Sequence, residues 1–149
     1  MQILEFGSPK GIPVIFHFGT PQRGDAGAEF SALAASLNVR LICPTRPWYD
    51  NRESELAFSQ VTTPTLRYLS EQGIVRAHAV GGSGGGPFAL HLAQEGSKMI
   101  ADATLFASMG HPASFAKLVS SPPTVHLLCV FASGDHREWM EASATWGLT

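Results

Sequence analysis

The sequence predicts an α/β protein with a mostly parallel sheet and helices on both faces. Short apolar runs rich in Val, Ile and Phe alternate with segments whose apolar residues recur at helical spacing. Such alternation favours a parallel sheet, because each helix returns the chain to the start of the next strand. A serine enclosed by glycines, Gly81-Gly82-Ser83-Gly84-Gly85, follows one of the predicted strands and precedes a helix. This order indicates a sharp turn at the end of a strand.

The N-terminal third of the chain is predicted to form three strands and one helix. Each strand is an apolar, β-branched or aromatic run bounded by turn residues, and the three cover 3–6, 13–18 and 39–43. Apolar residues recur at helical spacing between 26 and 37. Asp25 is the expected N-cap of this helix, and Asn38 is its expected end.

Two helices and two strands are expected in the middle of the chain. Thr63 is suited to cap a helix that runs to Gln72, because Pro64 then takes the first helical position. The strand before the glycine turn covers 75–80, the helix after the turn covers residue 87 to about 94, and the next strand covers 100–106.

The remaining residues give weaker patterns. Residues 125–131 fit either a strand or a buried helical turn, because periodicity cannot decide so short a run. Short helices are expected over 112–119 and 137–145.

Composition limits the class of protein. The length of 149 residues predicts one domain, and the net charge of −2 gives no electrostatic case for nucleic acid or an acidic membrane surface. The first residues lack the pattern of a signal peptide, and no apolar stretch approaches the roughly 18 residues that a membrane span needs. Cys43 and Cys129 lack metal-ligand spacing. We therefore expect a cytoplasmic protein without a metal or cofactor.

The glycines around Ser83 indicate that this serine occupies a strained turn. Glycine two positions before and two positions after it removes clashes from a strained turn. The N–H of Gly84 would then point from a helix N-terminus toward developing negative charge. The alternative is a turn that merely connects, or one that holds a phosphate. A dinucleotide fingerprint would need a third glycine, but its place falls on Pro87 or Ala89, and the lysine of a P-loop is missing.

Two further motifs precede the serine. The segment His17-Phe18-Gly19-Thr20-Pro21 follows a predicted strand, and residues 44–49 (PTRPWY) follow the next one. With the glycine-wrapped serine, these motifs resemble the α/β-hydrolase family of the serine type over residues 1–110. The resemblance implies that Ser83 attacks an acyl carbonyl, while the N–H groups of Gly84 and Thr20, in the turn at Gly19, hold the oxyanion.

The sequence also departs from the family pattern. Phe18 stands where the family usually has a histidine, which affects the hydrogen bonding of its loop. Trp48 and Asp50 replace small residues, which would narrow the mouth of the pocket. Trp48, Tyr49 and Phe88 are expected to line or shape that pocket, mainly by packing.

The resemblance implies an acid and then a histidine after the serine, on later loops. Asp135 follows an apolar run and a glycine-containing turn that resemble those delivering the acid, but His136 is its immediate neighbour and cannot act from a separate loop. His111 follows the strand beside that of the serine and is the candidate for a displaced base. In a second alignment, residues 139–149 resemble the end of a cap domain, and the chain stops before both acid and base.

Other titratable residues after the serine receive structural interpretations. His91 lies on the flank of the helix that follows the turn, and His126 lies within an apolar run. Asp102 opens a strand and is therefore expected at the opposite edge of the sheet from Ser83.

Two functions therefore remain open. The first is a serine hydrolase that acts on a small-molecule ester or other acyl substrate. The alternative is a catalytically incomplete remnant or binding module, because loss of the base can cost about a millionfold in kcat. We expect one truncated or shortened domain over 1–149, with a core at 1–110, a shortened cap or C-terminal remnant at 111–149 and one or more C-terminal strands lacking. An open sheet edge would favour self-association.

Overall fold

The computed structural model describes residues 1–47 and 57–108 together with the backbone of residues 126–130. Within these residues, a six-stranded sheet has the order β1-β3-β2-β4-β5-β6. Its strands are β1 (Ile3–Gly7), β2 (Ile12–His17), β3 (Val39–Pro44), β4 (Ala77–Gly82), β5 (Ile100–Phe106) and β6 (His126–Val130). All neighbouring pairs are parallel except β1 and β3, so the predicted mostly parallel sheet is confirmed.

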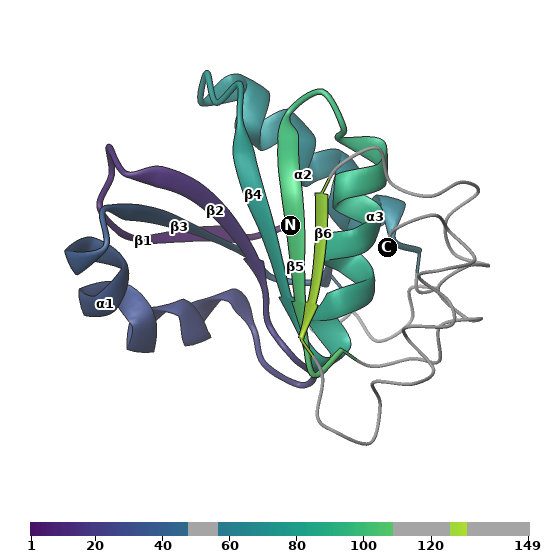
Figure 1. The fold of residues 1–149 in the computed structure, drawn as a ribbon, viewed down its shortest axis with the longest axis horizontal. Helices are drawn as coiled ribbons and strands as arrows, with labels where there is room; N and C mark the ends of the chain where they lie inside the picture. The colour runs from purple at the N-terminus through teal and green to yellow at the C-terminus, as the bar shows by residue number, and fades with distance from the viewer. Residues whose placement is uncertain (48–56, 109–125, 131–149) are drawn as a thin grey trace.

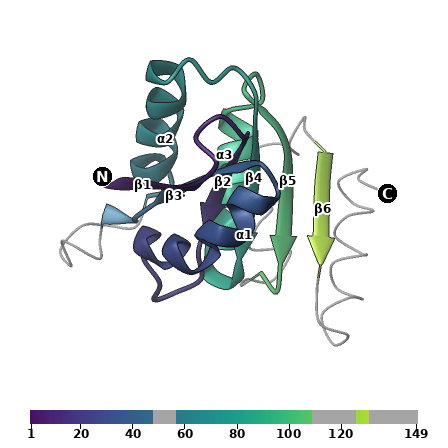
Figure 2. The same ribbon diagram turned by 90° about the vertical axis from the view of Figure 1, so that its left-hand side faces the viewer.

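Helices cover both faces of the sheet, as predicted (Figures 1 and 2). One face carries a 3-10 helix, η1, followed by α1, and the other carries α2 and α3. A short 3-10 turn, η3, leads directly into α3. The bounds are η1 (Gly24–Phe30), α1 (Ser31–Ser36), α2 (Ser59–Glu71), η3 (Ser83–Gly85) and α3 (Gly86–Glu95).

Two apolar clusters hold these layers together. Successive side chains of a strand point to opposite faces, so neighbours in β2 enter different clusters. Ile15 belongs to the larger cluster, between the sheet and the layer of α2 and α3, whereas Phe16 packs with the smaller one beside α1. The larger cluster also contains Ile42, Leu69, Ala79, Leu90, Leu92, Ala103 and Leu105. Burial of each large side chain contributes about 1.5–3 kcal/mol.

The helix predicted over 26–37 is divided in two, and the expected cap at Asp25 is wrong. A 3-10 segment precedes α1, and its N-cap residue, Arg23, makes no side-chain capping bond. A methyl group on Gly27 would lie 2.7 Å from Cys43 Sγ, so this segment approaches the sheet more closely than a regular helix with side chains could. The end at Asn38 is confirmed, because Leu37 caps α1 and Asn38 has a φ of 53°.

Helix α2 begins at Ser59, four residues before the predicted cap, so Pro64 lies inside the helix. The buried side of α2 starts at Val61, and this tertiary packing outweighs the local preference of proline for the first turn. Strand β4 begins at Ala77 rather than at Val75, which is 82% exposed.

Of the three elements predicted toward the C-terminus, the structure describes one. The segment predicted over 125–131 forms strand β6, so the alternative of a buried helical turn is wrong. The helices expected over 112–119 and 137–145 fall outside the described residues.

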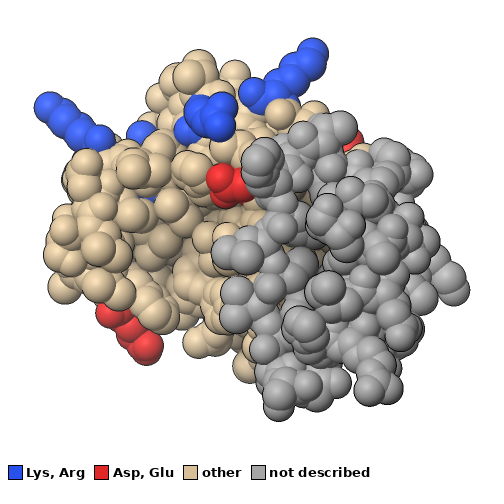
Figure 3. Space-filling view, in the orientation of Figure 1, with Lys and Arg blue, Asp and Glu red and all other residues tan. Residues whose placement is uncertain are grey.

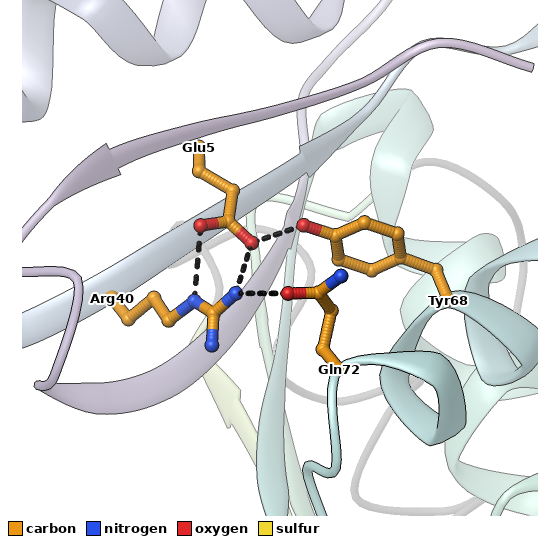
Figure 4. Close-up of polar contacts among 4 residues, drawn as sticks. All are labelled: Glu5, Arg40, Tyr68 and Gln72. Atoms are coloured by element: carbon orange, nitrogen blue, oxygen red, sulfur yellow. Dashed lines mark hydrogen bonds and ion pairs between the residues drawn. The ribbon is translucent and has the colours of Figure 1, made fainter.

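A polar network ties the antiparallel edge of the sheet to α2 (Figure 4). Arg40 of β3 donates from Nε and Nη2 to the Glu5 carboxylate of β1, at 3.0 and 2.6 Å. Tyr68 donates its hydroxyl proton to the same carboxylate, and Gln72 accepts from Arg40 at 3.1 Å. The network crosses three elements and therefore fixes β1, β3 and α2 relative to one another.

Figure 3 shows the charged side chains on one face of the molecule. On the face drawn in Figure 3, the charged side chains are few and scattered. Among the described helices, none combines the length and the apolar character required to cross a bilayer.

We expect Leu69→Ala to lower the free energy of unfolding by about 2–5 kcal/mol, because it empties a fully buried site in the larger cluster. Leu37→Ala is the matched control: Leu37 is 63% exposed, so its truncation should cost under about 0.5 kcal/mol. Urea-induced unfolding measures both. Equal losses in the two variants would contradict the assignment of the core.

Candidate active site

Ser83 occupies a sharp turn between β4 and α3. Its φ is 47°, in the left-handed region that residues with side chains rarely adopt. The extended backbone of β4 ends at Gly82, and the 3-10 turn begins at Ser83 itself. The serine therefore stands at the N-terminus of a helical segment, where backbone N–H groups carry partial positive charge.

Two of the flanking glycines are required by close backbone approach. A methyl group on Gly85 would overlap the carbonyl oxygen of His17, at the end of β2. A methyl group on Gly81 would lie 2.7 Å from the carbonyl oxygen of Gly85. Hence the turn can pack against β2 and fold back on itself only without side chains at these two positions.

The loop after β2 lies directly beside this turn. A methyl group on Gly19 would lie 3.2 Å from Ser83 Cβ, and one on Gly84 would lie 3.2 Å from the backbone nitrogen of Thr20. The structure therefore brings together four residues singled out in the sequence: Gly19, Thr20, Ser83 and Gly84. They come from two loops that are far apart along the chain.

Arg46 joins the same two loops, and sequence reasoning did not assign it to the site. It follows β3, is only 5% exposed, and donates from Nη1 to the carbonyl oxygen of Gly84 at 3.0 Å. Its Nη2 lies 3.1 Å from the carbonyl oxygens of both Phe18 and Gly19. The available signal was the arginine in the motif at 44–49, but its bonding partners depend on how distant loops meet.

His17 is buried beneath the loop after β2. It is 2% exposed, and neither ring nitrogen has a hydrogen-bond partner. Burial, assisted by the positive charge of Arg46, lowers the pKa of His17 to about 3. The neutral ring packs 6.1 Å from the ring of Phe88, centroid to centroid. His17 is therefore a neutral packing residue rather than a general base.

Phe88 has the packing role expected of it. Its ring is 4% exposed and contacts Phe58, and the Arg46 guanidinium carbon lies 5.2 Å from its centroid. Such a cation over an aromatic face is favourable. Trp48 and Tyr49, the other two residues expected at the pocket, lie outside the described residues.

The two other histidines with described side chains are occupied elsewhere. His91 Nδ1 lies 2.9 Å from the Thr62 hydroxyl across the contact of α3 with α2, as its structural interpretation anticipated. His78 Nδ1 lies 2.8–2.9 Å from the carboxylate oxygens of Asp102. Asp102 pairs with His78 near the start of β5, four positions before the residue that pairs with Gly82, so it lies away from Ser83 as predicted.

Cys43 is unsuited to act as a nucleophile. Its side chain is fully buried in the smaller cluster, and burial raises the pKa of the thiol to about 12.

His111 and Asp135 lie outside the described residues, but the strands that precede them do not. Phe106, the last residue of β5, pairs with Gly82 on one side and with Val130, the last residue of β6, on the other. Both strands therefore end at the sheet edge where Ser83 stands. Ser108 already lies against the start of α3, because a methyl group on Gly86 would overlap the Ser108 side chain.

Comparison with known proteins identifies the fold. No protein-family model matches the sequence, and no curated protein matches it. An α/β-hydrolase fold protein from Nakamurella multipartita aligns with a TM-score of 0.62 and 23% identity, over 74% of this chain and 38% of that protein. A serine hydrolase from Cycloclasticus zankles aligns with a TM-score of 0.60 and 19% identity, over 74% and 42%.

A third structure aligns over nearly the whole chain. MGS-MChE2, an α/β-hydrolase enzyme from the metagenome of lagoon sediments at Mar Chica in Morocco, gives a TM-score of 0.70 and 12% identity, over 97% of this chain and 78% of that one. The chain has the α/β-hydrolase fold, as its motifs suggested. It spans only 36–45% of the length of the first structures that it matches.

We expect acid to destabilise the protein through His17. Its pKa is about 3 when folded and about 6.5 when exposed, so below about pH 6.5 only the unfolded chain takes up this proton. The contribution of neutral His17 to the free energy of unfolding is therefore complete above about pH 6.5 and is lost as the pH falls toward 3. His17→Phe should remove this component, so its unfolding free energy should fall less between about pH 7.5 and pH 4.

Urea-induced unfolding across this pH range measures the effect. His78→Gln serves as a control, because His78 is half-exposed and lies at a distance from the buried site. Parallel pH profiles for the wild type and His17→Phe would show that the buried imidazole does not carry the effect.

Proposed function

We propose that the protein is a serine hydrolase that transfers the acyl group of a small ester-like substrate to water. One observation carries the proposal: Ser83 stands in a left-handed turn, and the backbone amides of Gly84 and Thr20 belong to adjoining residues of the two loops that meet there. Backbone N–H groups arranged around a nucleophile stabilise the negative charge of a tetrahedral intermediate, and one such donor is worth about 10²–10³ in kcat.

The reaction proceeds in two balanced steps. The Ser83 oxygen forms a bond to the carbonyl carbon and gives its proton to a base, and the carbonyl oxygen becomes an oxyanion held by the amides of Gly84 and Thr20. Collapse breaks the bond to the leaving alcohol, which takes the proton. Water then attacks the acyl-serine with the same base, releasing the carboxylic acid and restoring the Ser83 hydroxyl.

His111 is the proposed base and Asp135 the proposed acid. Ser108 lies against the start of α3. His111 follows Ser108 by three residues, and three residues span at most about 11 Å. Asp135 follows β6 by five residues, from the same edge of the sheet. The positions of Ser108 and of the end of β6 therefore support these two proposed roles.

The competing function is a binding module that keeps the turn but lacks a working base. The described histidines favour this reading: His17 is buried and neutral, His78 is paired with Asp102, and His91 contacts Thr62. The two functions differ in the reactivity of one hydroxyl. A serine without a base reacts with electrophiles far more slowly than one that a base activates.

We expect a fluorophosphonate probe to label the folded protein stoichiometrically at Ser83, because a base and an oxyanion hole activate that hydroxyl. Intact-mass measurement and peptide mapping would locate the adduct. Ser83→Ala should abolish labelling, whereas Ser97→Ala, at an exposed position before β5, should leave it unchanged. A folded wild-type protein that remains unlabelled would exclude the hydrolase and leave the binding module.

We expect His111→Ala to lower the labelling rate at Ser83 by about 10³-fold or more, because removal of a triad base has effects of this order or larger. His136→Ala is the matched control and should react like the wild type. Stopped-time labelling with mass detection gives both rates. An unchanged rate in His111→Ala would assign the base to another group while leaving the serine nucleophile in place.

A further inference from the structure

We propose that Arg46 is a positioning residue that sets the direction of the Thr20 amide, polarises it, and holds it beside the turn that carries the Gly84 amide. The inference rests on the proposed function and adds a residue to its machinery. Its basis is the juxtaposition of one buried guanidinium with carbonyl oxygens from both loops of the site.

The Gly19–Thr20 peptide shows how the effect would arise. Arg46 Nη2 donates to the Gly19 carbonyl oxygen at 3.1 Å, and this carbonyl shares a planar peptide unit with the N–H of Thr20. In a trans peptide the C=O and the N–H point in opposite directions. Holding the oxygen toward Arg46 therefore turns the Thr20 N–H away from Arg46, and the nitrogen of Thr20 adjoins Gly84 in the turn that carries Ser83.

The same side chain also holds the turn after β4. Arg46 Nη1 donates to the Gly84 carbonyl oxygen at 3.0 Å, and Nη2 also donates to the Phe18 carbonyl at 3.1 Å. Thr20 and Gly84 are far apart in sequence, so nothing local fixes the distance between their amides. The planar guanidinium of Arg46 is bonded to both loops and therefore holds the two amides at a fixed separation.

Charge adds to the geometric effect. A cation bonded to a carbonyl oxygen draws electrons along the peptide and strengthens the N–H at its other end as a donor. Because Arg46 is only 5% exposed, solvent screens this charge weakly. Its influence already appears at His17, where the charge of Arg46 helps to keep the imidazole neutral by lowering its pKa.

Lysine would not replace this arrangement. An ammonium group is a compact point charge, whereas the guanidinium presents donors from two nitrogens in a fixed plane. Arg46→Lys therefore retains charge and removes the fork. Arg40→Lys is the matched control, because Arg40 also makes forked bonds, but to Glu5 and Gln72 at the far edge of the sheet (Figure 4).

The test measures fluorophosphonate labelling at Ser83 as a function of probe concentration, which separates the maximal rate constant from the half-saturating concentration. We expect Arg46→Lys to lower the maximal rate constant at least 10-fold with little change in half-saturation, because the affected groups act on the transition state. Hydrogen exchange should quicken at the amides of Thr20 and Gly84 while remaining unchanged in β5. Arg40→Lys should match the wild type in both measurements.

Each result has one meaning. A labelled Arg46→Lys with the wild-type maximal rate overturns the positioning role and leaves the hydrolase intact. An unlabelled wild type overturns both. If Arg46→Lys does not fold, the guanidinium NMR signals of Arg46 in the wild type decide: a shift on phosphonylation of Ser83 supports the proposal, and an unchanged signal overturns it.

Discussion

The site depends on one close backbone contact, between the end of β2 and the turn that follows β4. The carbonyl oxygen of His17 occupies the space that a side chain at position 85 would need. This contact places the loop after β2 beside Ser83, and the parallel pairing of β2 with β4 aligns the two strand ends. Without it, the amides of Thr20 and Gly84 would belong to separate surfaces. The glycines thus serve the meeting of two loops as much as the strained φ of Ser83.

Burial of polar groups beneath this contact has two different outcomes. Arg46 is buried with several carbonyl partners, so much of its lost hydration is replaced by hydrogen bonds. His17 is buried with neither ring nitrogen bonded, which costs about 1–3 kcal/mol for each unsatisfied group. An imidazole is a far weaker base than a guanidinium, so His17 is the group that loses its proton while Arg46 keeps its charge. An apolar ring at position 17 would avoid this cost.

The parts of the structure that local sequence determines could be predicted, and those set by distant contacts could not. The glycines around Ser83 act on their own turn, so strand, turn and helix followed from a short window of sequence. Asp25 is a good N-cap by propensity, yet the segment there is a 3-10 helix whose Gly27 lies too close to Cys43 for a side chain to fit. Pro64 favours a helix start, but the buried side of α2 begins at Val61 and extends the helix backward. The role of Arg46 requires knowing that residues 18, 19 and 84 meet, which no local pattern records.

The same reasoning explains why a recognisable turn is weaker support for an active hydrolase than for the fold. The turn at Ser83 needs only glycines and a neighbouring strand, so it persists wherever β2, β4 and α3 pack as they do here. Acyl transfer needs in addition a base that meets the serine from another loop, and its absence costs far more than the loss of one oxyanion donor. Geometry at Ser83 and reactivity at Ser83 are therefore separate properties. The first is built into the sheet, whereas the second, in the proposed hydrolase, would require His111 and Asp135 to complete the site.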